Sequence, residues 1–192
     1  MTIDAGGQRS SAESGAQADG GPIGFIDFEA SGLGARSWPI EVGWGLPDRD
    51  PDSVLITPDP RWPMEAWDPN AQALHGLTPD QLREFGVSPR EACRRLDAAL
   101  AGRHVYSDAP DYDATWLGVL YQTAAMRPSF RICDMRDLIA ALAPLDALSD
   151  ILEKADRLEP HTHRAAQDVR NLQAIHSLSV AANDRLARAA GK

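Results

Sequence analysis

The stretch GFIDFEASGLG, residues 24–34, carries two carboxylates at the end of an apolar run. Its first half is apolar and predicts a buried strand, which ends at Asp27 and Glu29. Because side chains alternate along a strand, both carboxylates project from one face, and Ile26 and Phe28 project from the other. Neighbouring carboxylates repel, and each raises the pKa of the other unless a cation lies between them. The pair therefore indicates a divalent-metal site.

A solvated strand end is the alternative interpretation, because carboxylates with this spacing recur in the sequence. Three further pairs lie in loops or at a helix start: Asp48/Asp50, Asp50/Asp52 and Asp111/Asp113. Asp27 and Glu29 differ from them in closing an apolar strand. Taken alone, the pair leaves both interpretations open.

Length and composition predict one globular domain. The chain has 192 residues, 43% of them hydrophobic, which is enough for a single core. Residues 1–22 are rich in Gly, Ser, Ala and Gln and predict a flexible tail before a domain that spans 23–192. No apolar run approaches the roughly 18 residues of a membrane span, and the N-terminus lacks a secretory pattern. Cys93 and Cys133 lack metal-type spacing, so we expect reduced thiols and a cytoplasmic location.

The charge balance bears on the partners of the protein. The formal net charge is −9 and the pI is about 4.9. A long grip on nucleic acid is therefore disfavoured, because such binding depends on many contacts between Lys or Arg and phosphate. A site that holds a phosphodiester through divalent ions is compatible with this charge, since it needs clustered carboxylates.

The order of the expected elements predicts an α/β fold, a mixed sheet flanked by helices. Strands are expected at residues 23–28, 41–46 and 53–57, and their short connections favour an antiparallel meander. Thr78 and Ser88 each begin a helix with Pro at its first position. The later strands are expected at 103–107 and 130–135, and the later helices at 111–125, 135–143, 149–155 and 163–190.

A second acidic feature is YSDAPDYDATWL, residues 106–117. A strand ends there, and Asp113 enters a helix whose apolar face includes Tyr112 and Trp116. Open α/β sheets place their sites at strand ends of this kind. We expect one aspartate, Asp108 or Asp111, to cap the helix and another to bind metal.

A third feature is HTHRAAQDVRNL, residues 161–172, in which His163 and Asp168 are five residues apart. In a continuous helix this spacing separates two side chains by roughly 140°. His163 is therefore expected to act from the loop or the first turn, with Asp168 held in the helix. A helix-terminal histidine and a solvated aspartate is the alternative for this feature alone.

In this order the three features resemble the DEDD-type 3′→5′ exonucleases of the histidine subclass. This group includes the proofreading subunit of bacterial DNA polymerase, oligoribonuclease and ribonuclease T. The matching residues are Asp27 and Glu29 in FIDFEASGL, Asp113 in DAPDYDATWL, and His163 and Asp168 in HRAAQD. The resemblance covers about residues 23–180 and implies a ribonuclease H-like fold, with a three-strand antiparallel meander plus parallel strands.

The resemblance also implies a catalytic mechanism. Two divalent ions, Mg²⁺ or Mn²⁺, would be held by Asp27, Glu29, Asp113 and Asp168, with Asp27 between the two. His163 would serve as general base, since an ordinary imidazole pKa near 6.5 suits proton removal at neutral pH. The products would be a 5′-mononucleotide and a strand shortened at its 3′ end.

Further positions are candidates for substrate contact. Ala30 and Ser31 follow the glutamate, where the family often has Thr-Thr or Thr-Ser, and the backbone near Ala30 could contact the terminal sugar. Leu33 resembles a residue that wedges against terminal bases, with loop packing as an equal alternative. His75 begins HGLT, which resembles a histidine–glycine turn of the family.

Charged neighbours of these motifs are harder to assign. Asp108 stands where the family often has asparagine. Arg164 and Arg170 flank the histidine–aspartate element and are candidates for phosphate contact. Glu41 begins the second strand and is interpreted as an edge residue rather than a support of the site.

The sequence thus favours a metal-dependent 3′→5′ exonuclease acting on single-stranded DNA or RNA. Two alternatives remain open: a catalytically silent nucleic-acid or protein-binding module on the same fold, and a phosphodiesterase for small nucleotides. No membrane association is expected. The preferred sugar, the pathway and the oligomeric state, a dimer included, stay undetermined.

Overall fold

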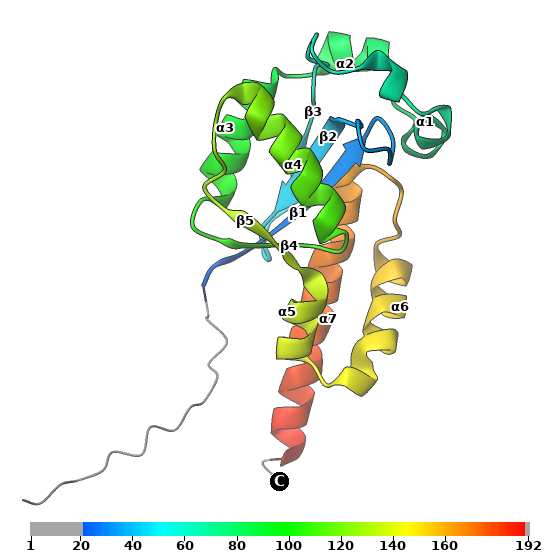
Figure 1. Cartoon of the computed structure of the whole chain (residues 1–192). Coiled ribbons are helices and arrows are strands. Elements are labelled where there is room, and N and C mark those ends of the chain that lie inside the picture. Colours follow the sequence, from blue (N-terminus) through cyan, green and yellow to red (C-terminus); the bar gives the residue numbers. More distant parts are fainter. Residues whose placement is uncertain (1–20, 191–192) are drawn as a thin grey trace, which may run out of the picture.

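The computed structural model describes residues 21–190, and the side chains of residues 21–188 (Figure 1). The flexible tail expected over residues 1–22 lies outside the described residues except for Gly21 and Pro22. Of the helices in the described range, none combines the length and the apolar character that crossing a bilayer requires.

Five strands form one mixed sheet with the order β3-β2-β1-β4-β5. The strands β1 (Ile23–Ala30), β2 (Pro39–Gly45) and β3 (Asp52–Leu55) are antiparallel neighbours. The strands β4 (His104–Ser107) and β5 (Arg131–Asp134) continue the sheet in parallel with β1. The predicted meander plus parallel strands is therefore confirmed, and β1 lies in the middle of the sheet.

Helices connect and cover these strands. In the described range, three lie between the meander and β4 in the chain, and four follow β4. Their bounds are α1 (Pro69–His75), α2 (Pro79–Phe85), α3 (Pro89–Leu100), α4 (Pro110–Ala124), α5 (Met135–Leu142), α6 (Leu148–Leu158) and α7 (Ala165–Ala190). Single 3₁₀ turns occupy Met64–Ala66 and Leu145–Ala147.

The two faces of the sheet carry different helices. Ile26 and Phe28 point into one core, which α3 and α4 complete with residues such as Leu96 and Leu120. Phe25 belongs to a second core with α5, α6 and α7. Because side chains alternate along β1, Asp27 and Glu29 share the face of Phe25. The carboxylate pair therefore faces the side of α7, as Figure 1 shows for the arrangement of these elements.

Two local predictions are confirmed and two are wrong. Thr78 forms a complete capping box with Gln81 at the start of α2, and the side chain of Ser88 caps α3. By contrast, neither Asp108 nor Asp111 caps α4: its N-cap is Ala109, with no side-chain cap from the described residues. The hydroxyl of Ser107 accepts the N–H of Ala109 instead. Tyr112, expected inward, is 50% exposed and stacks on Trp116.

Candidate active site

The start of α7 packs directly against the central strands, because β2 has a glycine at the point of contact. Gly43 pairs with Asp27 across the sheet. A Cβ at Gly43 would lie 2.5 Å from both the carbonyl carbon and the oxygen of Ala165, so only hydrogen fits there. This close approach brings the first turn of α7, and with it Asp168, beside the carboxylates of β1.

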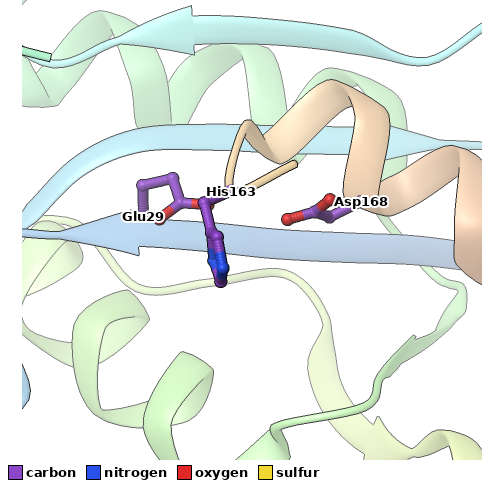
Figure 2. Close-up of side chains that lie close together, drawn as sticks. All are labelled: Glu29, His163 and Asp168. Atoms are coloured by element: carbon purple, nitrogen blue, oxygen red, sulfur yellow. The ribbon is translucent and has the colours of Figure 1, made fainter. Parts of the chain in front are cut away.

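His163 precedes α7 and lies in a loop with a left-handed backbone, φ 55°. A residue other than glycine rarely adopts this conformation, and a fixed position next to a site is one reason for it. Figure 2 shows His163, Glu29 and Asp168 close together. Ligand atoms of the three lie within 4.8 Å of one another. The expectation that His163 lies before the helix and Asp168 within it is confirmed.

Asp113 comes from the first turn of α4 and is 1% exposed. The hydroxyl of Ser107, at the end of β4, donates a hydrogen bond to its Oδ2. Ser107 is itself fully buried. Its neighbour Asp108 is exposed and lies in the same loop.

Burial and mutual repulsion raise the pKa values of these carboxylates. Burial raises the pKa of Asp27 well above its ordinary range, and the charges of Asp113 and Glu29 raise it further. Burial, followed by repulsion from Asp168, raises the pKa of Glu29 to about 8. Burial also raises the pKa of Asp113 to about 7, against the opposing effect of its bond from Ser107.

The donor set fits divalent cations. Buried polar atoms normally have hydrogen-bond partners, yet the Oδ2 of Asp27 and the Oδ1 of Asp113 are buried and have none among the described residues. Carboxylate oxygens are the ligands that Mg²⁺ and Mn²⁺ prefer. A cation would satisfy these oxygens and offset the repulsion that raises the pKa values.

The carboxylate of Glu41 has hydrogen-bond partners, unlike the buried oxygens of Asp27 and Asp113, and Glu41 is not the edge residue that we expected. It lies on β2, between β3 and β1, and is 1% exposed. Its carboxylate accepts two hydrogen bonds from Arg164, at 2.9 and 3.1 Å, and one each from the Ala165 N–H and the Ser53 hydroxyl. Arg164 directly follows His163, so Glu41 anchors the backbone that carries the histidine. The guanidinium that we expected to contact phosphate is engaged here.

A cavity of about 260 Å³ adjoins Glu29 and His163. Three of the candidates for substrate contact, Ala30, Leu33 and His75, line it together with Trp116 and the exposed side chain of Leu74. Leu33 is 70% exposed and therefore does not serve loop packing. A cavity with this lining suits a partly apolar ligand.

Ser31 and His75 differ in what they offer to a ligand. The Ser31 hydroxyl accepts the Trp38 N–H, so it holds its own loop. The Nδ1 of His75 accepts the Leu77 N–H, which leaves the proton of the neutral ring on Nε2. Burial lowers the pKa of His75 and favours this neutral form. Its Nε2 is buried without a partner in the described part of the chain, so it is an unused donor.

His161 is a residue of this region that sequence reasoning did not single out. Its Nδ1 lies 3.5 Å from the Oδ1 of Asp168, and its Nε2 lies 3.9 Å from Asp108 and 3.8 Å from Asp156. Its bond with Asp168 raises the pKa of His161, against the effect of burial. The pattern HTH offered one signal for it, since a second histidine stands two residues before His163.

No family model matches the sequence, and no curated protein matches it. The fold, however, is similar to that of exonuclease I. The chain matches E. coli exonuclease I in complex with a dT13 oligonucleotide with a TM-score of 0.65 and 16% identity, over 86% of this chain and 42% of that chain. A moderately thermophilic exonuclease I from Methylocaldum szegediense gives a TM-score of 0.59 and 20% identity, over 80% of this chain and 39% of that one.

A further exonuclease I structure matches with a TM-score of 0.66 and 17% identity, over 85% of this chain and 42% of that chain. At these identities the likeness establishes the fold alone, which is ribonuclease H-like as expected. The chain spans about two fifths of the length of the exonuclease I chains that it matches.

Proposed function

We propose that the protein is a metal-dependent 3′→5′ exonuclease that removes 5′-mononucleotides from the 3′ end of single-stranded nucleic acid. The observation that carries the proposal is the set of buried, unpartnered carboxylate oxygens of Asp27 and Asp113 beside the Glu29–His163–Asp168 group. A purely structural role would not leave such buried atoms unsatisfied.

The residues divide into metal ligands and a base. Asp27, Glu29, Asp113 and Asp168 would hold two divalent ions, Mg²⁺ or Mn²⁺. When bound, such ions stabilise negative charge on the attacking and departing oxygens of a phosphodiester. His163 is exposed in a loop and accepts the proton of the attacking water as general base.

The adjoining cavity provides for the terminal nucleotide. Leu33 and Leu74 offer exposed apolar surface to the base, and the Nε2–H of His75 is a donor for a hydroxyl or carbonyl oxygen. Several of the solved exonuclease I structures contain DNA oligonucleotides, one of them described as a complex with single-stranded DNA, which supports single strands as the substrate class. Only a few nucleotides at the 3′ end are gripped, since the net charge is −9.

Strand-shortening assays test this function. Purified protein is incubated with 5′-labelled single-stranded DNA and RNA, in Mn²⁺ or in EDTA. We expect a metal-dependent ladder that shortens from the 3′ end and shows which sugar is preferred. His163→Ala should lower the rate about 10³-fold, as for loss of a general base, while the matched His161→Ala variant keeps the rate within about tenfold.

Other outcomes select the other two functions. A wild-type protein that binds the oligonucleotides without cutting them would be a binding module. One that cleaves small nucleotide esters but no strand would be a phosphodiesterase. Equal losses in the two histidine variants would contradict the role given to His163.

A further inference from the structure

A second cavity, of about 350 Å³, opens between α5, α6 and α7 and shares no lining residue with the first. Its volume lies in the range of small-ligand pockets. The apolar part of its wall comes from all three helices: Met135, Ile139, Leu148, Leu152 and Ile175. Leu152 is 39% exposed. The surface suits the face of a planar ring.

Asn171, fully buried in the wall of this cavity, carries an unused acceptor. Its Nδ2 donates to the Oδ1 of Asp156 at 2.9 Å and to the carbonyl of Glu159 at 2.8 Å. Both partners can only accept, so they fix which side of the amide is the oxygen. That oxygen, Oδ1, is buried and has no partner among residues 21–188. It calls for a ligand with an N–H or O–H donor.

The cavity adjoins the carboxylate cluster through two of its lining residues, His161 and Asp108. His161 contacts Asp168 with one ring nitrogen and faces Asp108 with the other. His163, from the same loop, lines the first cavity. The loop therefore lies between the two cavities and contributes one histidine to each. Asp168 lies next to both histidines.

Arg136 adds a positive charge to this second cavity. It is exposed at the start of α5, where its backbone N–H is held by Asp134. In the described part of the chain its guanidinium has no ion pair. An unpaired arginine at the edge of a pocket is suited to a phosphate.

We propose that this second cavity binds the nucleoside on the 5′ side of the scissile phosphodiester, the second from the 3′ end. The inference rests on the proposed exonuclease function. The base lies on the apolar wall and donates a hydrogen bond to Asn171, and Arg136 contacts the next phosphate. The terminal nucleoside occupies the first cavity, so the bond to be cut lies at the carboxylates between the two.

Comparison of two substrates tests this subsite. Thymidine 5′-(p-nitrophenyl phosphate) has the terminal nucleotide but no second nucleoside, whereas the dinucleotide dTpdT has both. In Arg136→Ala and in Leu152→Glu, we expect KM for dTpdT carrying a 5′-phosphate to rise about tenfold, the scale of one lost charge-assisted contact. Hydrolysis of the nitrophenyl ester should stay within about twofold. Arg131→Ala and Leu145→Glu, at exposed sites outside the cavity, should change neither.

A change in the substrate gives an independent test without altering the protein. Replacing the second base from the 3′ end of a short oligonucleotide by an abasic site should raise KM about tenfold in the wild type, as for loss of one stacked base. In Leu152→Glu the same replacement should have little effect, because that contact is already lost.

The outcomes separate failure of the subsite from failure of the proposed function. If the wild type hydrolyses neither substrate, the exonuclease function fails and the subsite with it. If it hydrolyses both, and the cavity variants slow both equally or neither, the subsite is overturned while the function stands.

Discussion

The carboxylate of Glu41 on β2 lies next to the carboxylate cluster that is centred on β1, and their surroundings differ. Glu41 on β2 is opposite Glu29 on β1 in the sheet register. Glu41 receives hydrogen bonds from Arg164, Ser53 and the backbone of Ala165. Asp27 and Asp113 each keep a buried oxygen with no partner in the described part of the chain. The fold pairs Glu41 with a guanidinium, whereas the described residues leave these two oxygens of Asp27 and Asp113 unpaired.

The contrast distinguishes a carboxylate that stabilises the fold, Glu41, from the carboxylates that would bind metal. A buried charge is tolerated when it is paired and hydrogen-bonded, as Glu41 is. Clustered carboxylates without a counter-charge raise one another's pKa and destabilise the folded chain. Their presence at a strand end is explained if a bound cation neutralises them. The metal-free protein is then less stable than it would be without the cluster.

Asp27→Asn should have the largest effect. It removes a charge that would hold the ions, so the exonuclease rate should fall about 10³-fold or more, equivalent to ~4 kcal/mol of transition-state stabilisation. The same change relieves repulsion, so the melting temperature in EDTA should rise by about 4 °C. Rate assays and thermal unfolding measure the two effects.

The exposed Asp50→Asn change serves as the control for charge alone, and both quantities should stay near the wild-type values. An Asp27→Asn protein that is less stable than the wild type in EDTA would show that the charge of Asp27 is compensated in the fold.

Arg164→Ala reverses the comparison, because it leaves the buried Glu41 without its counter-charge. We expect the free energy of unfolding to fall by about 3 kcal/mol. Glu41→Gln keeps an acceptor for Arg164 and should cost only about 1 kcal/mol. Urea denaturation gives both values. Arg36→Ala breaks the exposed pair with Glu65 and should leave stability unchanged within error. Similar losses for Arg164→Ala and Arg36→Ala would rule out the anchoring role.

Gly43→Ala tests the close approach of α7 to β2. The new methyl group would overlap the backbone of Ala165, so the first turn of α7 must shift, and unfolding should become easier by about 2 kcal/mol. The rate should fall as well, since Asp168 moves with the helix. Gly118→Ala, in open space on α4, should instead stabilise by about 0.5–1 kcal/mol. Equal effects at the two glycines would refute the tight contact.

The smallest expected effect is the dependence of stability on pH, measured in EDTA, and it sharpens the same comparison. The pKa of Glu29 is raised to about 8 and that of Asp113 to about 7. Between the ordinary carboxyl range and these values the folded chain holds protons that the unfolded chain has released, so stability falls as pH rises. From pH 5 to pH 8 the melting temperature should drop by about 5 °C.

Mn²⁺ should flatten this dependence, because the ion takes the place of the protons. The Glu29→Gln change should weaken the pH dependence of the melting temperature even in the absence of metal. His161 contributes a loss in the same direction, since its pKa is raised. A drop of equal size in wild type and in Glu29→Gln would assign the effect to Asp27, Asp113 or His161 instead.

Much of the fold was predictable from the sequence, because its signals are local. The alternation in β1 and the caps at Thr78 and Ser88 act within a few residues, and all three predictions are confirmed. The cap of α4 was mispredicted because the hydroxyl of Ser107 performs part of the task that we gave to an aspartate.

The supports of the site were not predictable, because they join segments far apart in the sequence. Glu41 and Arg164 are 123 residues apart, and the reason for Gly43 lies in Ala165 on α7. The second cavity likewise needs three helices, and Asn171 reads in the sequence as an ordinary helix residue. The motif residues were found because each ends or begins an element.

Mn²⁺ binding measured by isothermal titration calorimetry tests the central claim most directly. With the metal-free wild type at pH 7.5 we predict that two ions bind per chain and that Asp27→Asn loses at least one of them. Glu41 should receive no metal, so Glu41→Gln should retain both. A wild-type protein that binds no Mn²⁺, or that binds it equally well with Asn at position 27, would contradict the account.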